Sequence, residues 1–86
     1  MSFLTETQIM INRQSNMGNI NRTKYHELNQ LLWDMHQKFI NPKLAFELYE
    51  RRWGYVDQKK LLTKEKNLIN RLTNEFGNGF FMPAVN

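Results

Sequence analysis

KYHELNQLLWDMHQKF, residues 24–39, is the stretch with the strongest periodic pattern in the chain. Its apolar residues recur at intervals of mostly three and four positions, at Tyr25, Leu28, Leu31, Leu32, Met35 and Phe39. This spacing places them on one stripe of an α-helix, and neither proline nor glycine interrupts the run. Thr23, just before the stretch, is a residue type that favours the N-cap position. The pattern therefore predicts a helix over residues 24–39 whose apolar stripe faces the core.

A second helix is predicted directly after this stretch. Pro42 disfavours helical backbone at Asn41, yet it is well suited to the first turn of a new helix. We therefore expect Asn41 to cap a helix over residues 42–53, which closes at Gly54 in the left-handed conformation. Because its apolar residues lie on two sides, this helix is expected to pack between other elements.

A third helix is predicted over residues 64–76. Thr63 is expected to be its N-cap, and Glu65 lies near the positive end of the helix dipole. Gly77 is expected to end the helix, because glycine is favoured just after the last helical turn. The chain then continues as an extended apolar tail.

The N-terminal region has a weaker pattern. A capping box at Thr5 and Gln8 favours a helix over residues 6–16, but residues 8–12 fit a short strand nearly as well. We therefore expect an all-α fold, a small three- to four-helix orthogonal or bundle-like domain with an apolar C-terminal tail, in which a short N-terminal strand is the alternative. The expected organisation is one domain over residues 1–86, with residues 1–22 as a loosely attached arm and 80–86 as the tail.

Size and composition exclude several classes of protein. The chain has 86 residues and no cysteine, which excludes disulfides, cysteine-ligated zinc and thiol chemistry. No stretch approaches the roughly 18 apolar residues that a membrane span needs, and the N-terminus does not resemble a secretion signal. We therefore expect a cytoplasmic protein that does not act at a membrane. So small a core also favours association of two copies as a homodimer.

No pattern of residues indicates catalysis or metal binding. His26 and His36 are ten positions apart, roughly 15 Å along a helix, and cannot share one metal ion. Glu47 and Glu50 lie on the same predicted helix surface as Lys43 and Arg51, which is typical of charge pairing. No nucleophile with an orienting base and no glycine-rich phosphate loop is recognisable. We expect a protein that is not an enzyme and uses no metal, cofactor or small-molecule substrate.

Large aromatic residues form the first candidate site. Phe46, Tyr49 and Trp53 recur at three-to-four spacing on the second predicted helix, while Trp33 lies off the main stripe of the first. Packing in the core is one interpretation, and exposure at an interface, where aromatic residues dominate binding, is the other. The first functional hypothesis is a non-catalytic interaction or regulatory module that binds a protein partner or itself. Its candidate residues are Trp33, Phe46, Tyr49, Trp53, Phe80 and Phe81.

Positive charge forms the second candidate site. The net charge is +4, and residues 38–71 contain nine basic and four acidic residues. A solvated basic face is one interpretation, and an anionic partner is the other. Asparagine and arginine, which read adenine and guanine edges, gather on the polar face of the third predicted helix. The connection before that helix, about eight residues, is longer than a helix-turn-helix allows. The alternative hypothesis is a DNA-binding regulator, with candidate residues Arg52, Lys59, Lys60, Lys64, Asn67, Asn70, Arg71 and Asn74.

Overall fold

Three α-helices and a small sheet make up the part of the chain that the structure, a computed structural model, describes: residues 17–84. The elements in order are β1 (Ile20–Asn21), the 3₁₀ helix η1 (Arg22–Lys24), α2 (His26–Leu31), β2 (Phe39–Ile40), α3 (Pro42–Arg51), the 3₁₀ helices η2 (Trp53–Tyr55) and η3 (Gln58–Lys60), and α4 (Thr63–Phe76). The predicted helix over residues 6–16, with its alternative of a strand, lies outside the described residues.

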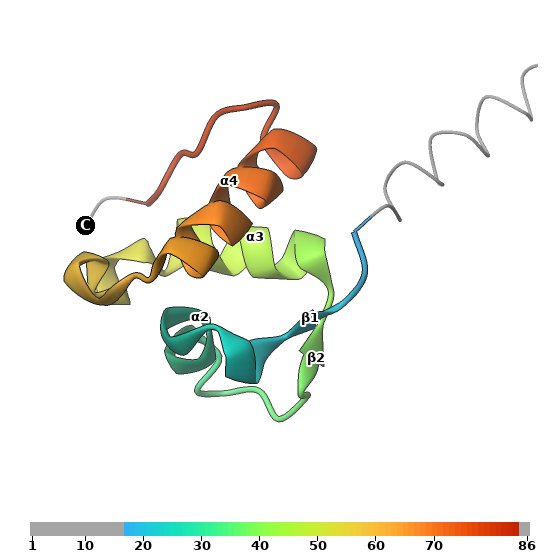
Figure 1. The fold of residues 1–86 in the computed structure, drawn as a ribbon, viewed down its shortest axis with the longest axis vertical. Coiled ribbons are helices and arrows are strands. Elements are labelled where there is room, and N and C mark those ends of the chain that lie inside the picture. Colours follow the sequence, from blue (N-terminus) through green and yellow to red (C-terminus); the bar gives the residue numbers. More distant parts are fainter. Residues whose placement is uncertain (1–16, 85–86) are drawn as a thin grey trace, which may run out of the picture.

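Helix α3 lies between α2 and α4, and the β1–β2 sheet closes one end of the domain (Figure 1). This arrangement agrees with the two apolar sides of α3. Side chains from both sides of α3 join one buried core, which consists of Ile20, Leu28, Leu31, Leu32, Ile40, Ala45, Phe46, Leu48, Tyr49, Val56, Leu68, Ile69 and Leu72.

The all-α prediction is wrong, because β1 and β2 pair as a two-stranded antiparallel sheet. Ile20 lies opposite Ile40, and Asn21 lies opposite Phe39. Side chains alternate between the faces of a strand, so the two isoleucines enter the core while Phe39 stays on the outer face, 55% exposed. Each strand has only two residues, too few for an alternating pattern to be visible in the sequence. The fold is a mostly helical domain with a small sheet.

The prediction of one helix over residues 24–39 is also wrong, because α2 ends at Leu31 and a loop leads to β2. Arg22 accounts for this end. Its guanidinium donates hydrogen bonds to the carbonyl oxygens of Leu32, at 2.8 Å, and Met35, at 2.6 Å. In a continuing helix these carbonyl oxygens would accept from backbone N–H groups further along the chain. Contacts with a distant arginine therefore override the local apolar periodicity. Nor does the threonine before this stretch cap α2, because it lies within η1.

The start of α3 follows the sequence prediction closely. The side-chain oxygen of Asn41 accepts hydrogen bonds from the backbone N–H groups of Lys43, at 2.9 Å, and Leu44, at 3.3 Å. The end of α3 differs, because the helix stops at Arg51 and Gly54 lies within η2 without a left-handed conformation.

Helix α4 also agrees with its predicted range within one residue. Thr63 is its first residue and makes no capping hydrogen bond, so the predicted cap is wrong. Gly77 is the C-cap, as expected, and its backbone N–H donates to the carbonyl oxygen of Thr73 at 2.9 Å.

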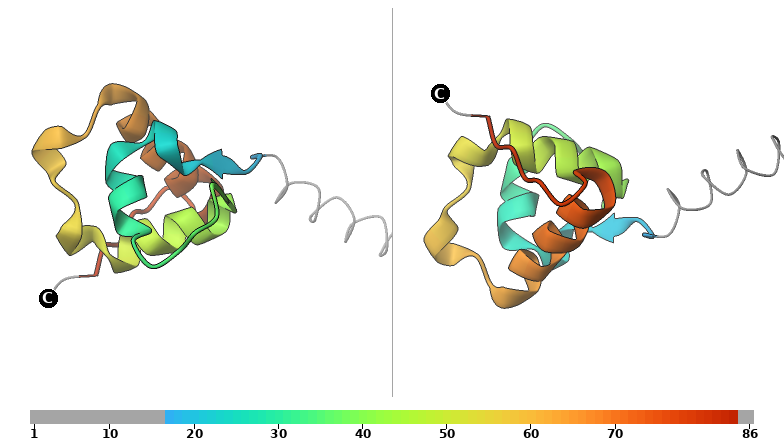
Figure 2. Two further views of the ribbon diagram at one scale, coloured as in Figure 1. Left: turned by 90° about the horizontal axis from the view of Figure 1, so that it is seen from below. Right: turned by 90° about the horizontal axis from the view of Figure 1, so that it is seen from above.

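The C-terminal tail runs back beside α3 (Figure 2). Glu50 holds it at two points: its carbonyl oxygen accepts from the N–H of Ala84, and its carboxylate accepts from the N–H of Met82, both at 2.7 Å. The ring of Phe81 packs edge-on against Trp53, with 4.9 Å between the ring centroids. In the described part of the chain, no helix is long and apolar enough to cross a membrane.

Candidate functional site

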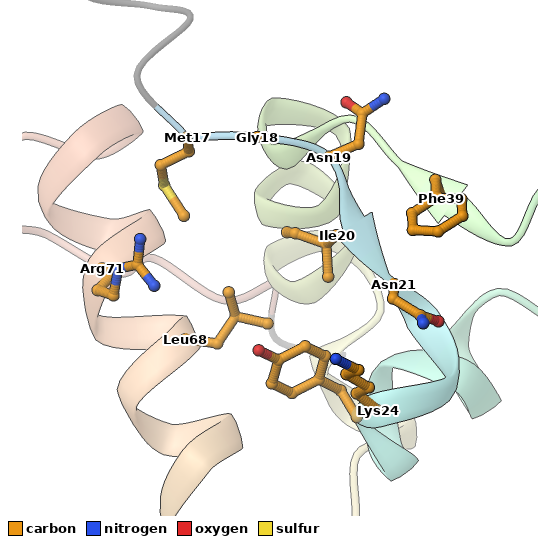
Figure 3. Close-up of a pocket in the computed structure, with 10 residues that line it drawn as sticks. Met17, Gly18, Asn19, Ile20, Asn21, Lys24, Phe39, Leu68 and Arg71 are labelled. Carbon is orange, nitrogen blue, oxygen red and sulfur yellow. The ribbon is translucent and has the colours of Figure 1, made fainter.

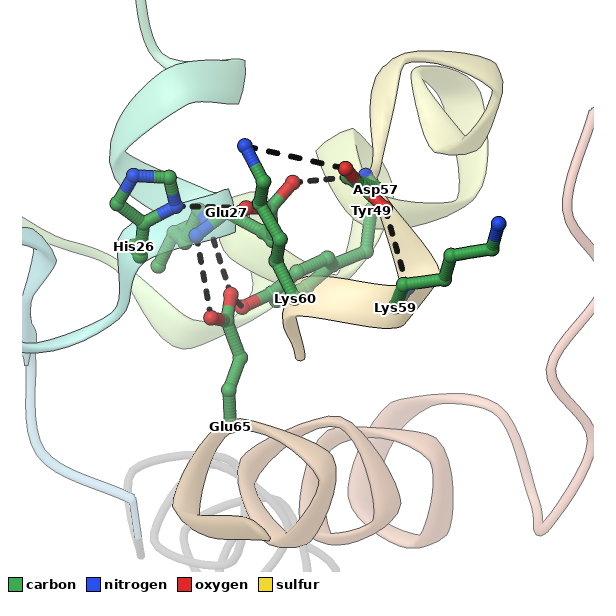
Figure 4. A network of polar contacts seen from close by, with 8 residues as sticks. His26, Glu27, Tyr49, Asp57, Lys59, Lys60 and Glu65 are labelled. Atoms are coloured by element: carbon green, nitrogen blue, oxygen red, sulfur yellow. Dashed lines mark hydrogen bonds and ion pairs between the residues drawn. The ribbon is translucent and has the colours of Figure 1, made fainter. Parts of the chain in front are cut away.

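Two glutamates, Glu27 and Glu65, lie inside the domain. Glu65 of α4 is only 2% exposed. Its two carboxylate oxygens accept hydrogen bonds from the backbone N–H groups of Glu27, at 3.1 Å, and Leu28, at 2.8 Å, in the first turn of α2 (Figure 4). The hydroxyl of Tyr49 donates a third hydrogen bond, at 2.6 Å. Glu65 therefore caps the N-terminus of α2 from another helix, where a negative charge is favoured.

Glu27 is the second internal glutamate. One of its oxygens accepts from the backbone N–H of Asp57 at 2.7 Å, and the other lies 2.6 Å from Nδ1 of His26 (Figure 4). Burial raises the pKa of Glu27, but the hydrogen bonds from Asp57 and His26 outweigh it, so the pKa lies below its ordinary value of 4.5. Every buried side-chain polar atom of residues 17–84 has a hydrogen-bond partner. The network thus joins α2, α3, α4 and the loop before η3, and it leaves no buried polar atom of that segment free for a ligand.

Placing these two carboxylates inside leaves a basic surface. Residues 17–84 contain eleven lysines and arginines, none of them buried, and seven aspartates and glutamates. Glu27 and Glu65 are buried, so five acidic residues remain exposed or partly exposed. All eleven basic residues are exposed or partly exposed. The described surface is thus more basic than the composition alone indicates.

The predicted polar residues of α4 lie together on its exposed face. They are opposite the buried face of the helix, and they are Lys64, Asn67, Asn70, Arg71 and Asn74. Lys59 and Lys60 of η3, just before the helix, are also exposed. We call these seven residues the α4 surface.

Arg52, which was predicted with this set, is directed elsewhere. Its guanidinium forms a bidentate salt bridge with the carboxylate of Asp34, with N–O distances of 2.8 and 3.0 Å. It also donates a hydrogen bond of 2.8 Å to the carbonyl oxygen of Leu31. The hydrogen bond with Asp34 raises the pKa of Arg52, and the same bond lowers the pKa of Asp34. Arg52 therefore serves the C-terminal end of α2, where an isolated helix would leave carbonyl oxygens unpaired.

A groove of about 440 Å³ lies beside the α4 surface, between α4 and the β1–β2 sheet. Arg71 and Leu68 come from α4 on one side, and Lys24 lies on the other, near Asn21 of β1 (Figure 3). Phe39 of β2 also lines it. Among the described residues that line this groove, none is an aspartate or glutamate.

Sequence reasoning missed the aromatic and basic residues on the sheet side of this groove. Tyr25 lines the groove, and Nζ of Lys64 lies 5.7 Å from its ring centroid. Nζ of Lys38 lies at the same distance from the ring of Phe39. Both rings were expected on the core stripe of a long helix. Phe39 reaches the groove because α2 ends at Leu31, whereas Tyr25 precedes α2 and is still partly packed against the core. No local signal in the sequence marks that end, because it depends on contacts with Arg22 and Arg52.

Two of the residues predicted for a protein interface lie in the core. Phe46 is 5% exposed and Tyr49 is fully buried. Trp53 and Phe81 are half-buried and cover one another. These four side chains therefore stabilise the fold.

The other two predicted interface residues are exposed. Trp33 is 76% exposed beyond the end of α2, where the guanidinium of Arg52 lies 5.6 Å from its ring centroid. Phe80 is 71% exposed in the tail. The structure therefore does not bring the six aromatic residues together on one surface. Within the described residues, no three or more histidine, aspartate or glutamate side chains lie close enough together to hold a metal ion.

Comparisons with protein-family models, with curated protein sequences and with solved structures found no match. The function is therefore inferred from the geometry of the described residues.

Proposed function

We propose that the protein binds nucleic acid through the α4 surface. The observation that carries this proposal is the separation of charge between interior and surface. The glutamate of the first turn of α4, Glu65, is buried, whereas the five α4 residues of the α4 surface are exposed on the opposite face. One acidic residue of the helix, Glu75, is exposed. This arrangement supports binding of a polyanion, because neutralising phosphates provides most of the affinity of such proteins.

The spacing of the charged residues supports the same function. Lys64 and Arg71 are seven positions apart, so they lie nearly in line on the helix, about 10 Å apart along its axis. A row of this length reaches more than one phosphate of a nucleic-acid strand. Asn67, between them, and Asn70 and Asn74 offer amide groups that can both donate to and accept from base edges.

Fluorescence anisotropy with a labelled oligonucleotide tests the proposal. Arg71→Ala should lower the affinity and reduce the slope of log K against log salt by roughly 0.9 on duplex DNA for each phosphate that the variant no longer neutralises. The matched control is Arg51→Ala, which removes the same charge from an exposed position beside Glu47 and Glu50. If the two variants bind equally, the α4 surface is not the binding site. If neither duplex nor single-stranded nucleic acid binds at roughly tens of micromolar protein in low salt, the protein does not bind nucleic acid.

Binding of a protein partner or of a second copy is a second candidate function. Trp33 is exposed, and a more apolar groove of about 440 Å³ lies between α4 and the tail, lined in part by Ile69 and Phe81. Phe80 is exposed, and its two sequence neighbours, Gly79 and Phe81, line this groove. In a homodimer, Phe80 of one copy could therefore insert into the groove of the other copy. Sedimentation equilibrium at micromolar concentration tests this function. If the wild type, Trp33→Ala and Phe80→Ala all sediment with the mass of a monomer, the homodimer is excluded.

A further inference from the structure

We infer that the groove between α4 and the β1–β2 sheet selects single-stranded over duplex nucleic acid, by stacking unpaired bases on Phe39 and Tyr25. This inference rests on the proposed function and extends it to the class of nucleic acid. It shares Lys64 and Arg71 with the α4 surface, but the ring that tests it, Phe39, lies outside that surface, so the two proposals can fail separately.

The exposure of Phe39 is the first observation. Its pairing with Asn21 across the sheet fixes the backbone of β2 so that the ring faces outward, 55% exposed. An exposed aromatic ring held by a strand is a platform on which a base can stack, as on the sheets of proteins that bind single strands. In a duplex the base faces are covered by neighbouring pairs, so the ring discriminates between the two forms.

The cations around the rings are the second observation. Nζ of Lys38 lies 5.7 Å from the ring centroid of Phe39, and Nζ of Lys64 lies 5.7 Å from that of Tyr25. Each ring therefore has a cation over it, and Tyr25 is partly buried against the core, so Phe39 is the more accessible of the two rings. A cation close to a ring suits a nucleotide, because its base and its phosphate are joined through one sugar. Binding of single strands combines these two elements, aromatic stacking and a basic track for the backbone.

The shape and charge of the groove are the third observation. Arg71 and Lys24 lie on its opposite sides, and no carboxylate is found among the described lining residues (Figure 3). Its volume of about 440 Å³ is within the range of sites that enclose small ligands, which suits single bases and excludes a double helix. A duplex would contact the outer face of α4 without entering this groove.

Fluorescence anisotropy at one salt concentration, with an oligothymidine of about 15 nucleotides and a duplex of the same length, tests the inference. The wild type should bind the single strand more tightly. Phe39→Ala should weaken binding to the single strand roughly tenfold and leave binding to the duplex and the salt slope unchanged. Phe39→Trp should retain the preference, because tryptophan also stacks. The matched control is Phe80→Ala, which removes another exposed phenylalanine, outside the groove.

The outcomes separate the two proposals. Duplex binding that depends on Arg71, without preference for the single strand or with Phe39→Ala equal to Phe80→Ala, overturns this inference and keeps the proposed function. Absence of binding to either probe overturns both. Circular dichroism and urea unfolding of Phe39→Ala establish that it is folded, and Phe39→Trp provides the second variant if it is not.

Discussion

The hydroxyl of Tyr49 donates a hydrogen bond of 2.6 Å to the carboxylate of Glu65, and both side chains are buried. The same carboxylate accepts two backbone N–H groups at the start of α2, so one acidic side chain connects all three described α-helices. A buried charge is stable only when hydrogen bonds replace its hydration, and three do so here.

Replacing Glu65 with glutamine should lower the free energy of unfolding by roughly 2 kcal/mol, because an amide nitrogen, which cannot accept, takes the place of one of the two accepting oxygens and leaves at least one buried backbone N–H without its acceptor. Urea unfolding would show a lower midpoint with an unchanged slope. The matched control is Glu75→Gln, at an exposed position of the same helix, which should change stability by less than about 0.5 kcal/mol. Equal stability of the two variants would contradict the capping role.

Alkaline pH should destabilise the protein through Tyr49. Burial, and next the hydrogen bond to Glu65, raise the pKa of Tyr49 in the folded protein far above its ordinary value of 10.0. The unfolded chain therefore loses this proton first, so the stabilisation is complete below pH 10.0 and is lost as pH rises beyond it. Urea midpoints measured from about pH 8 to 11 should fall at the alkaline end, less so in Tyr49→Phe. Tyr55→Phe, at an exposed tyrosine, should behave as the wild type.

Acid should destabilise the protein through Glu27. Although burial raises its pKa, the hydrogen bonds from Asp57 and His26 keep it below 4.5 in the folded protein. The stabilisation is therefore present above pH 4.5 and is lost as pH falls from there through the folded pKa. The fall in urea midpoint between about pH 6 and pH 3 should be smaller in Glu27→Gln than in the wild type. The matched control is Glu47→Gln, because Glu47 takes no part in the hydrogen bonds around Glu27 and Glu65. Its urea midpoint should fall with pH as much as that of the wild type.

Gly77 should not tolerate alanine, whereas Gly54 should. A Cβ at Gly77 would lie 2.7 Å from Cζ of Phe46 and 3.0 Å from the carbonyl oxygen of Thr73, and it would also meet the carbonyl oxygen of Phe80. The resulting displacement of the tail should cost roughly 1–3 kcal/mol, measured by thermal unfolding. At Gly54 no atom lies within 4 Å of such a Cβ, so alanine there should be neutral or slightly stabilising. Similar melting temperatures for both variants would show that the close packing at Gly77 is absent.

The elements that the sequence predicted well are those with local boundary signals. Asn41 caps α3 and Gly77 caps α4 through contacts within a few residues, and both helices end within two residues of the predicted positions. The end of α2 depends instead on Arg22, which lies ten residues before the carbonyl of Leu32 that it binds. Such a contact between distant residues leaves no periodic signal, and so the loop and the sheet were missed.

The candidate site divides in the same way. Exposure of the five α4 residues in the α4 surface follows from helical periodicity, since positions opposite a stripe that includes Leu68 and Leu72 must face outward. The groove could not be predicted, because Phe39 reaches it through a strand and Tyr25 through the residue before α2. Burial of Phe46 likewise depends on which elements cover α3, which sequence spacing alone does not determine.

Arg22 stands apart from every proposed contact with a ligand, yet it determines how rigidly the groove is held. Its guanidinium makes five hydrogen bonds, to groups of Asn29, Leu32, Met35 and Gln37, and its backbone N–H binds the carbonyl oxygen of Lys38, directly before Phe39. A lysine there would keep the charge but could not span these acceptors, because it lacks the planar fork. In Arg22→Lys the surface charge would stay the same. The loop between α2 and β2 would lose these hydrogen bonds and would have to become ordered when the ligand binds. Recognition at this groove therefore depends on preorganisation supplied by a residue that never meets the ligand.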